Sequence, residues 1–130
     1  MLWGFRVDTN IDSGLGHVSR MLSILEIFDN KKNILFIVNS LKDKNCSIIR
    51  DHKYKLVDIN SLNDELDICI IDGYFFTRDE INLLIRKSQK IIQIDDHGYK
   101  YDYANKTINF LSNGAENAVV SDMFFSNNFY

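Results

Sequence analysis

The sequence has no proline and little cysteine: Cys46 and Cys69 are its two cysteines in 130 residues. Two cysteines at this spacing form neither a disulfide framework nor a zinc-binding pattern. We therefore expect reduced thiols, no bound metal and a cytoplasmic protein. The absence of proline has no functional interpretation.

The sequence also lacks an excess of basic residues and any long apolar run. Lys plus Arg number 15 and Asp plus Glu number 18, which gives a net charge of −3. This balance excludes a generally basic nucleic-acid binder and a polybasic membrane anchor. No uncharged apolar stretch reaches the roughly 18 residues of a membrane-spanning helix. Residues 1–6 lack the basic start and apolar region of a signal peptide.

What remains is the composition of one folded domain, with 45% apolar and 25% charged residues. Apolar runs alternate with helical periodicity. We expect strands at residues 2–7, 34–38, 54–59, 66–72, 90–95 and 106–111, an apolar helical stripe over 18–28, a weaker helix at about 40–50, and a third helix after Thr77 that includes Ile81, Leu84 and Ile85. This alternation predicts an α/β fold, a three-layer Rossmann-like sandwich with a parallel sheet in the strand order 3-2-1-4-5-6.

One helix start has a clear local signature. Thr77 and Glu80 are spaced as a capping box, and Phe76 and Ile81 are placed for a hydrophobic staple. We therefore expect the third helix to begin immediately after Thr77.

The first helix is expected to open with Gly14-Leu15-Gly16-His17. In an open parallel sheet, ligands bind beyond the carboxyl ends of the strands, where this segment lies. Two glycines permit a tight turn, and the first N–H groups of a helix favour an anion. His17, beside the positive end of the helix dipole, is expected to be a neutral imidazole and a usable base. The alternatives are a plain glycine turn and a capping or surface histidine.

Other polar residues occupy the apolar strands or their ends. Arg6 lies within a strand, so it is expected either to pair with Asp8, the nearest acidic residue on the same face, or to contact a ligand. Asp72 is a candidate helix cap or loop-ordering acceptor. Tyr74 is a candidate for stacking on a ring or for simple packing. The Asp95-Asp96-His97 run is too sparse for a metal site.

Four of these segments together carry a family resemblance. They are Phe5-Arg6-Val7-Asp8, Gly14-Leu15-Gly16-His17-Val18-Ser19-Arg20, Asp72-Gly73-Tyr74 and Ile94-Asp95-Asp96. In this order and spacing the chain resembles the N-terminal half of the UDP-sugar hydrolases of pseudaminic acid biosynthesis and the related spore-coat polysaccharide proteins.

The resemblance implies one half of a glycosyltransferase-B fold and hydrolysis of a UDP-linked 2,4-diacetamido-2,4,6-trideoxy sugar, without a metal or cofactor. By match, His17 is the base that activates water, and Tyr74 lies across the same cleft. The other residues that the resemblance places at the substrate are Asp8, Gly14, Gly16, Arg20 and Asp95.

Members of that family are considerably longer, because a second Rossmann-like domain supplies most nucleotide contacts. We therefore expect residues 1–112 to form the N-terminal domain and residues 113–130 a tail or the start of an interdomain connection. The partner would be a missing or separately encoded C-terminal domain. Without that domain we expect either an exposed apolar patch or a homodimer that hides it. The expected contributors are Phe124, Phe125, Phe129 and Tyr130. The alternative functions are a glycosyltransferase half that acts on a sugar acceptor and a non-catalytic assembly module.

Overall fold

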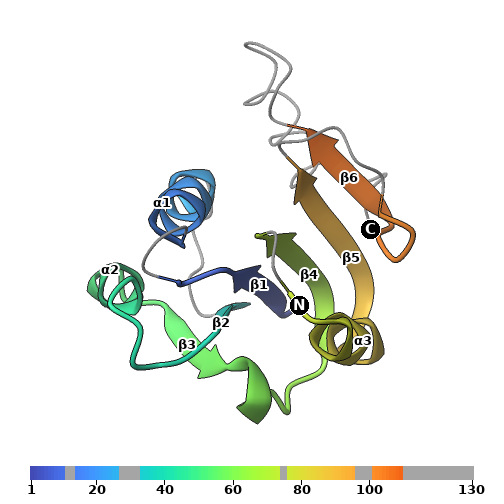
Figure 1. Cartoon of the computed structure of the whole chain (residues 1–130), viewed down its shortest axis with the longest axis horizontal. Coiled ribbons are helices and arrows are strands. Elements are labelled where there is room, and N and C mark those ends of the chain that lie inside the picture. Colours follow the sequence, from blue (N-terminus) through green and yellow to red (C-terminus); the bar gives the residue numbers. More distant parts are fainter. Residues whose placement is uncertain (11–13, 27–32, 74–75, 96–100, 110–130) are drawn as a thin grey trace.

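The computed structural model describes residues 1–10, 14–26, 33–73, 76–95 and 101–109, and these residues form an α/β structure (Figure 1). Its elements are β1 (Trp3–Val7), α1 (Gly14–Leu25), β2 (Ile34–Val38), α2 (Cys46–Asp51), β3 (Lys55–Asp58), the short 3₁₀ helix η2 (Ile59–Ser61), β4 (Leu66–Asp72), α3 (Arg78–Lys87), β5 (Ser88–Asp95) and β6 (Lys106–Asn109).

The strands form one six-stranded sheet in the order β3-β2-β1-β4-β5-β6, and every neighbouring pair is parallel. The predicted fold class and strand order are therefore confirmed. Strand β2 lies next to β1 at one of its edges, and β4 lies next to β1 at its other edge. The strand order therefore reverses between β1 and β4, which is the topological switch point of the sheet. Val7 pairs in register with Asp72, which brings the carboxyl ends of these two strands together.

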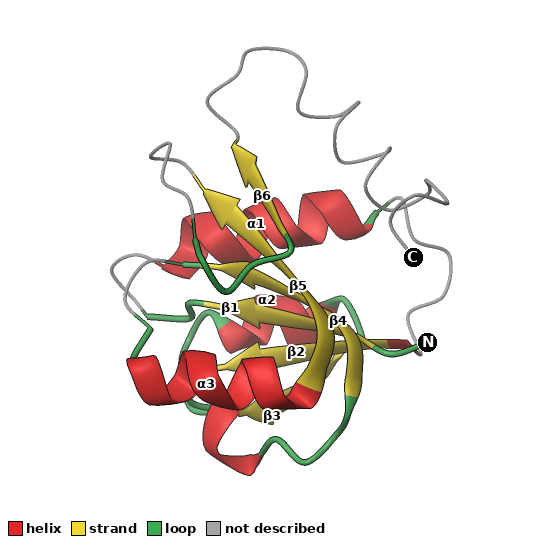
Figure 2. Cartoon of the chain, turned by 90° about the vertical axis from the view of Figure 1, so that its right-hand side faces the viewer, coloured by secondary structure: helices red, strands yellow, loops and turns green. Residues whose placement is uncertain are grey.

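Helices cover both faces of the sheet, as the two views show (Figures 1 and 2). The cluster beneath α1 and α2 includes Phe5, Phe36 and Ile70, and the first two rings stack 5.7 Å apart. The cluster beneath α3 includes Ile71 and Leu84. Because successive strand residues face opposite sides, continuous apolar runs are needed where both faces are buried. No helix among the described residues is long and apolar enough to cross a bilayer.

The start of α3 confirms the predicted N-cap. The Thr77 hydroxyl accepts a hydrogen bond from the Glu80 backbone N–H at 3.2 Å. The Glu80 carboxylate pairs with Arg6 on the neighbouring sheet. Glu80 therefore occupies position N3 of the helix and also links α3 to the sheet through its ion pair with Arg6.

The second helix begins later than expected. Residues 40–45 form turns, in which Asp43 N–H bonds to the Ser40 carbonyl and Lys42 N–H to the Ser40 hydroxyl. Short polar side chains that bond to nearby backbone groups compete with helix formation, so α2 starts only at Cys46. Of the strand expected at 106–111, residues 106–109 form β6, and residues 110 and 111 lie outside the described residues. The predicted tail and its aromatic patch lie outside the described residues.

Candidate functional site

The most elaborate side-chain cluster lies where α1 meets the carboxyl end of β4. His17 Nδ1 lies 2.8 Å from Asp72 Oδ1. Arg20 donates from Nε to Asp72 Oδ2 at 2.8 Å and from its terminal nitrogen to Oδ1. The predicted site residues His17 and Arg20 therefore converge on Asp72.

The contacts of His17 determine its tautomer. If Nδ1 carried a lone pair, that lone pair would face a carboxylate oxygen at hydrogen-bond distance, which is repulsive. Nδ1 therefore carries the proton and donates it to Asp72. The Arg20 terminal nitrogen lies 3.4 Å from Nδ1 because both donors share the same oxygen. This assignment puts the basic lone pair of the neutral ring on Nε2.

The carboxylate at the centre of the cluster is isolated from solvent. The Asp72 side chain is 0% exposed, His17 is 7% exposed and Arg20 is 22% exposed. A buried charge is strongly unfavourable unless it is paired and hydrogen-bonded. The guanidinium of Arg20 meets this requirement with a two-atom contact, so the carboxylate is held at a fixed position beneath His17.

The fold explains why these three residues meet. Ile68 and Ile70 of β4 belong to the cluster under α1, and Asp72, two residues further on, faces the same side. His17 and Arg20 are three positions apart on α1, so they share a helix face. Helix α1 follows β1, whose last residue pairs with Asp72. The switch point thus brings the helix face and the strand end together.

The first helix opens with Gly14, as expected, and Gly14 and Gly16 lie within its first turn. Among the described residues, no heavy atom outside the helix lies within 4 Å of a Cβ built at Gly16. A different glycine is closely packed: a Cβ at Gly73 would lie 2.5 Å from the Phe76 ring.

Asp8 belongs to a separate network at the same edge of the sheet. Its Oδ1 accepts hydrogen bonds from Asn10 N–H at 2.9 Å and from the Asn39 side-chain amide at 3.0 Å. Nearby, the Asn45 amide donates to the carbonyls of Thr9 and Asn10 at 3.2 and 2.9 Å. These bonds connect the segment after β1 to the segments after β2, so Asp8 orders a loop beside the histidine cluster.

The expected Arg6–Asp8 pair is wrong. Arg6 is 1% exposed and forms its ion pair with Glu80 of α3 at 3.3 Å. It also donates to the carbonyls of Val7 and Ile37 and lies over the Phe76 ring at 4.2 Å. Burial lowers the pKa of Arg6, and the charge of Glu80 opposes that shift. Arg6 faces α3, so the partner on that helix is within reach.

The remaining predicted residues either lie away from the histidine cluster or fall outside the described residues. Asp95 faces the α3 side of the sheet and accepts a hydrogen bond from the Tyr101 hydroxyl at 3.2 Å. Tyr74, Asp96 and His97 lie outside the described residues. Within the described part of the chain, His, Cys, Asp and Glu side chains form no group of three that could hold a metal ion.

Asp72 is the site residue that sequence reasoning missed. The sequence offers Asp72 only as a helix cap or a loop-ordering acceptor, but Thr77 caps α3 and Asp72 accepts hydrogen bonds from α1. The position of Asp72 could have indicated this contact. Asp72 shares a strand face with Ile68 and Ile70, and a right-handed crossover places α1 over that face.

Comparison with known proteins adds no relative: no protein-family model, curated protein or solved structure matches the chain.

Proposed function

We propose that this chain is the catalytic-base half of a nucleotide-sugar hydrolase, acting on a UDP-linked 2,4-diacetamido-2,4,6-trideoxy sugar. The observation that supports it best is the 2.8 Å contact between His17 Nδ1 and the buried carboxylate of Asp72. A carboxylate in this position fixes the ring and its tautomer and stabilises the imidazolium that forms when the ring accepts a proton. The family resemblance supplies the substrate class.

The proposed reaction begins with a water molecule beside Nε2 of His17. The water oxygen attacks the anomeric carbon of the sugar while Nε2 takes one of its protons. The bond between that carbon and the phosphate oxygen breaks, and UDP leaves with the electron pair. Positioned proton transfer of this kind contributes about 10²- to 10⁴-fold in rate.

Stabilisation of the departing diphosphate must come from further groups. The charge of Arg20 is already offset by Asp72, and the chain has a net charge of −3. The N-terminal turn of α1 can contribute backbone N–H groups to one phosphate. We propose that a second Rossmann-like unit, in the same or a separate polypeptide, supplies the remaining diphosphate contacts, since positioning alone contributes about 7–11 kcal/mol.

The test is UDP release followed by ³¹P NMR. The 130-residue chain is incubated with the UDP-linked diacetamido sugar, alone and with the C-terminal domain of a pseudaminic-pathway hydrolase added in trans. We expect release only in the mixture, and at least a 100-fold slower rate for His17→Ala. The matched control is His52→Ala, because His52 is exposed and lies after α2.

The products separate the proposed activity from the alternatives. Attack by water gives a free reducing sugar, whereas a glycosyltransferase half would give a glycoside and only with an added acceptor. Release that is unaffected by His17→Ala would contradict the assignment of the base. No release in any mixture, together with stable binding of the added domain, would favour a non-catalytic assembly module.

A further inference from the structure

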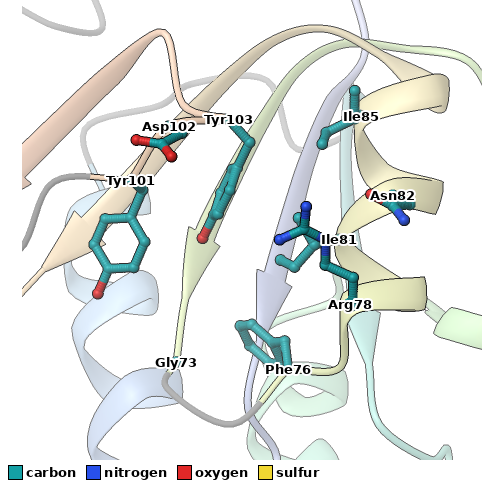
Figure 3. A pocket seen from close by; sticks show the side chains of 9 residues that line it. All are labelled: Gly73, Phe76, Arg78, Ile81, Asn82, Ile85, Tyr101, Asp102 and Tyr103. Atoms are coloured by element: carbon teal, nitrogen blue, oxygen red, sulfur yellow. The ribbon is translucent and has the colours of Figure 1, made fainter.

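A pocket of about 460 Å³ opens beside α3 (Figure 3). The histidine cluster lies on the other face of the sheet, the face that α1 covers. One wall is α3, and the other is the segment of residues 101–103 that precedes β6. Its volume lies within the roughly 300–1,000 Å³ of small-molecule sites. The proposed hydrolase does not use this pocket.

The wall formed by residues 101–103 is aromatic and firmly held. The rings of Tyr101 and Tyr103 lie 5.7 Å apart at 59°. The Tyr101 hydroxyl donates to Asp95 at 3.2 Å, and the Tyr103 hydroxyl donates to Gln93 at 2.7 Å. Asp95 and Gln93 are 0% and 1% exposed. Buried polar groups in a strand are unfavourable unless bonded, so these two residues act as anchors for the tyrosines.

The opposite wall combines apolar and polar side chains. Ile81 and Ile85 line it, with Phe76 at the end near Gly73 (Figure 3). The buried guanidinium of Arg6 lies over the Phe76 ring, 4.2 Å from its centroid, and so helps to fix the position of this ring. The guanidinium of Arg78 extends from α3 toward Tyr103 (Figure 3).

The charges of the lining point to a neutral ligand. Arg78 and Asp102 carry opposite charges and offset each other, and Asn82 offers an uncharged amide. The tyrosine rings provide flat apolar surface at one wall of the pocket. A pyranose matches this pattern, because one face exposes C–H groups and the edge carries hydroxyls. Since Tyr101 and Tyr103 are tilted, they cannot sandwich a flat heterocycle between parallel rings.

We propose that the pocket between α3 and residues 101–103 binds a neutral hexopyranose ring, by stacking on the tyrosines and by hydrogen bonds to Arg78, Asn82 and Asp102. This site is separate from the His17 cluster and does not depend on the hydrolase activity. A ligand of about a dozen non-hydrogen atoms is expected to bind with a Kd on the order of 1 mM.

The experiment is a ¹H–¹⁵N NMR titration of the full 130-residue chain with methyl α-glucopyranoside and with methyl N-acetyl-β-glucosaminide. We expect saturable shifts in the amides of α3 and residues 101–103 with at least one sugar. Ile85→Trp, at a position that is 42% exposed, fills the pocket and should weaken binding at least tenfold. The matched control is Arg86→Trp, the next residue on α3, which does not line the pocket.

His17→Ala should leave these shifts unchanged, which distinguishes this site from the proposed hydrolase site. Parallel titrations with uridine and benzoate test the ligand class. Saturation by uridine or benzoate but by neither sugar would overturn the assignment to a sugar. The absence of saturable shifts with both sugars at about ten times the expected Kd would also overturn it, as would equal weakening by Ile85→Trp and Arg86→Trp.

Discussion

Replacement of Asp72 by asparagine is the most informative change at the histidine cluster. The side chain keeps its size, but it loses the charge that faces Arg20. One of its two oxygens becomes an NH₂ group, which places a donor against a donor of Arg20 or His17. Both the ion pair and one hydrogen bond are lost.

The magnitude follows from burial. Breaking a fully buried ion pair by removing one partner costs about 3–5 kcal/mol, because the other charge is left uncompensated. Here Asp72 is fully buried but the Arg20 side chain is 22% exposed, so water can partly solvate the guanidinium. We therefore expect the free energy of unfolding to fall by about 2–3 kcal/mol, within the range for hydrogen bonds to charged groups.

The assay is urea unfolding followed by the fluorescence of Trp3, the single tryptophan, which is 5% exposed. With a slope of about 1–3 kcal/mol per molar urea, the midpoint should fall by about 1 M. Asp64→Asn is the matched control, because Asp64 is exposed, and it should stay within about 0.5 kcal/mol of the original protein.

A double-mutant cycle separates the pair from its parts. Asp72→Asn combined with Arg20→Met should cost less than the sum of the single changes, by about 0.5–3 kcal/mol. A midpoint for Asp72→Asn that equals that of Asp64→Asn, or strictly additive single changes, would refute the reasoning that Arg20 offsets a buried charge.

Three further predictions test other parts of the structure. Burial raises the pKa of Tyr103 to about 12, from 10, and that of Cys69 to about 12, from 9. The unfolded chain therefore loses these protons first, so the contribution of these two groups to the free energy of unfolding should be constant below about pH 8 and fall between about pH 9 and 12. Urea midpoints between pH 9 and 12 should show a shallower fall for Tyr103→Phe than for the original protein. Cys46 and Cys69 are fully buried, and burial raises the pKa of both thiols. Ellman's reagent should therefore react with the unfolded protein far faster than with the native protein. Rapid reaction of the native protein would contradict this burial. Thr77→Ala should lower the free energy of unfolding by about 1 kcal/mol and Thr77→Ser should restore most of it, as measured by urea unfolding, whereas equal stability of both variants would refute the N-cap.

The architecture could be predicted from the sequence because its signals are local. Residues 34–38 and 68–71 are continuous apolar runs, and both lie within strands of the structure. Their separation by helical segments requires crossovers, and right-handed crossovers leave few sheet orders. The helix start at Thr77 depends on contacts within four residues, so it too was predictable.

The partners of the buried charges could not be predicted in the same way. Asp72 and His17 are 55 residues apart, and Arg6 and Glu80 are 74 apart. Both pairings depend on which helix covers which face of the sheet. Asp8 is close to Arg6 in sequence, but its Oδ1 bonds to Asn10 and Asn39 at the end of the sheet. Proximity along the chain was therefore the wrong guide for Arg6.

The pocket on the α3 face was also beyond sequence reasoning. Tyr101 and Tyr103 were assigned no role, because their positions depend on bonds to Asp95 and Gln93 in the preceding strand. Asp95 was expected at the substrate by resemblance, and the structure places it beneath Tyr101, facing the α3 side of the sheet.

The most direct test of the oriented base is a long-range ¹H–¹⁵N correlation spectrum of the His17 imidazole at neutral pH, assigned by comparison with His17→Ala. For the uncharged ring we predict the proton on Nδ1 and the lone pair on Nε2, and a mixture of tautomers once Asp72→Ala removes both acceptor oxygens. An uncharged ring protonated on Nε2 alone, or one whose tautomer is unchanged by Asp72→Ala, would contradict the claim that Asp72 orients His17 as a base.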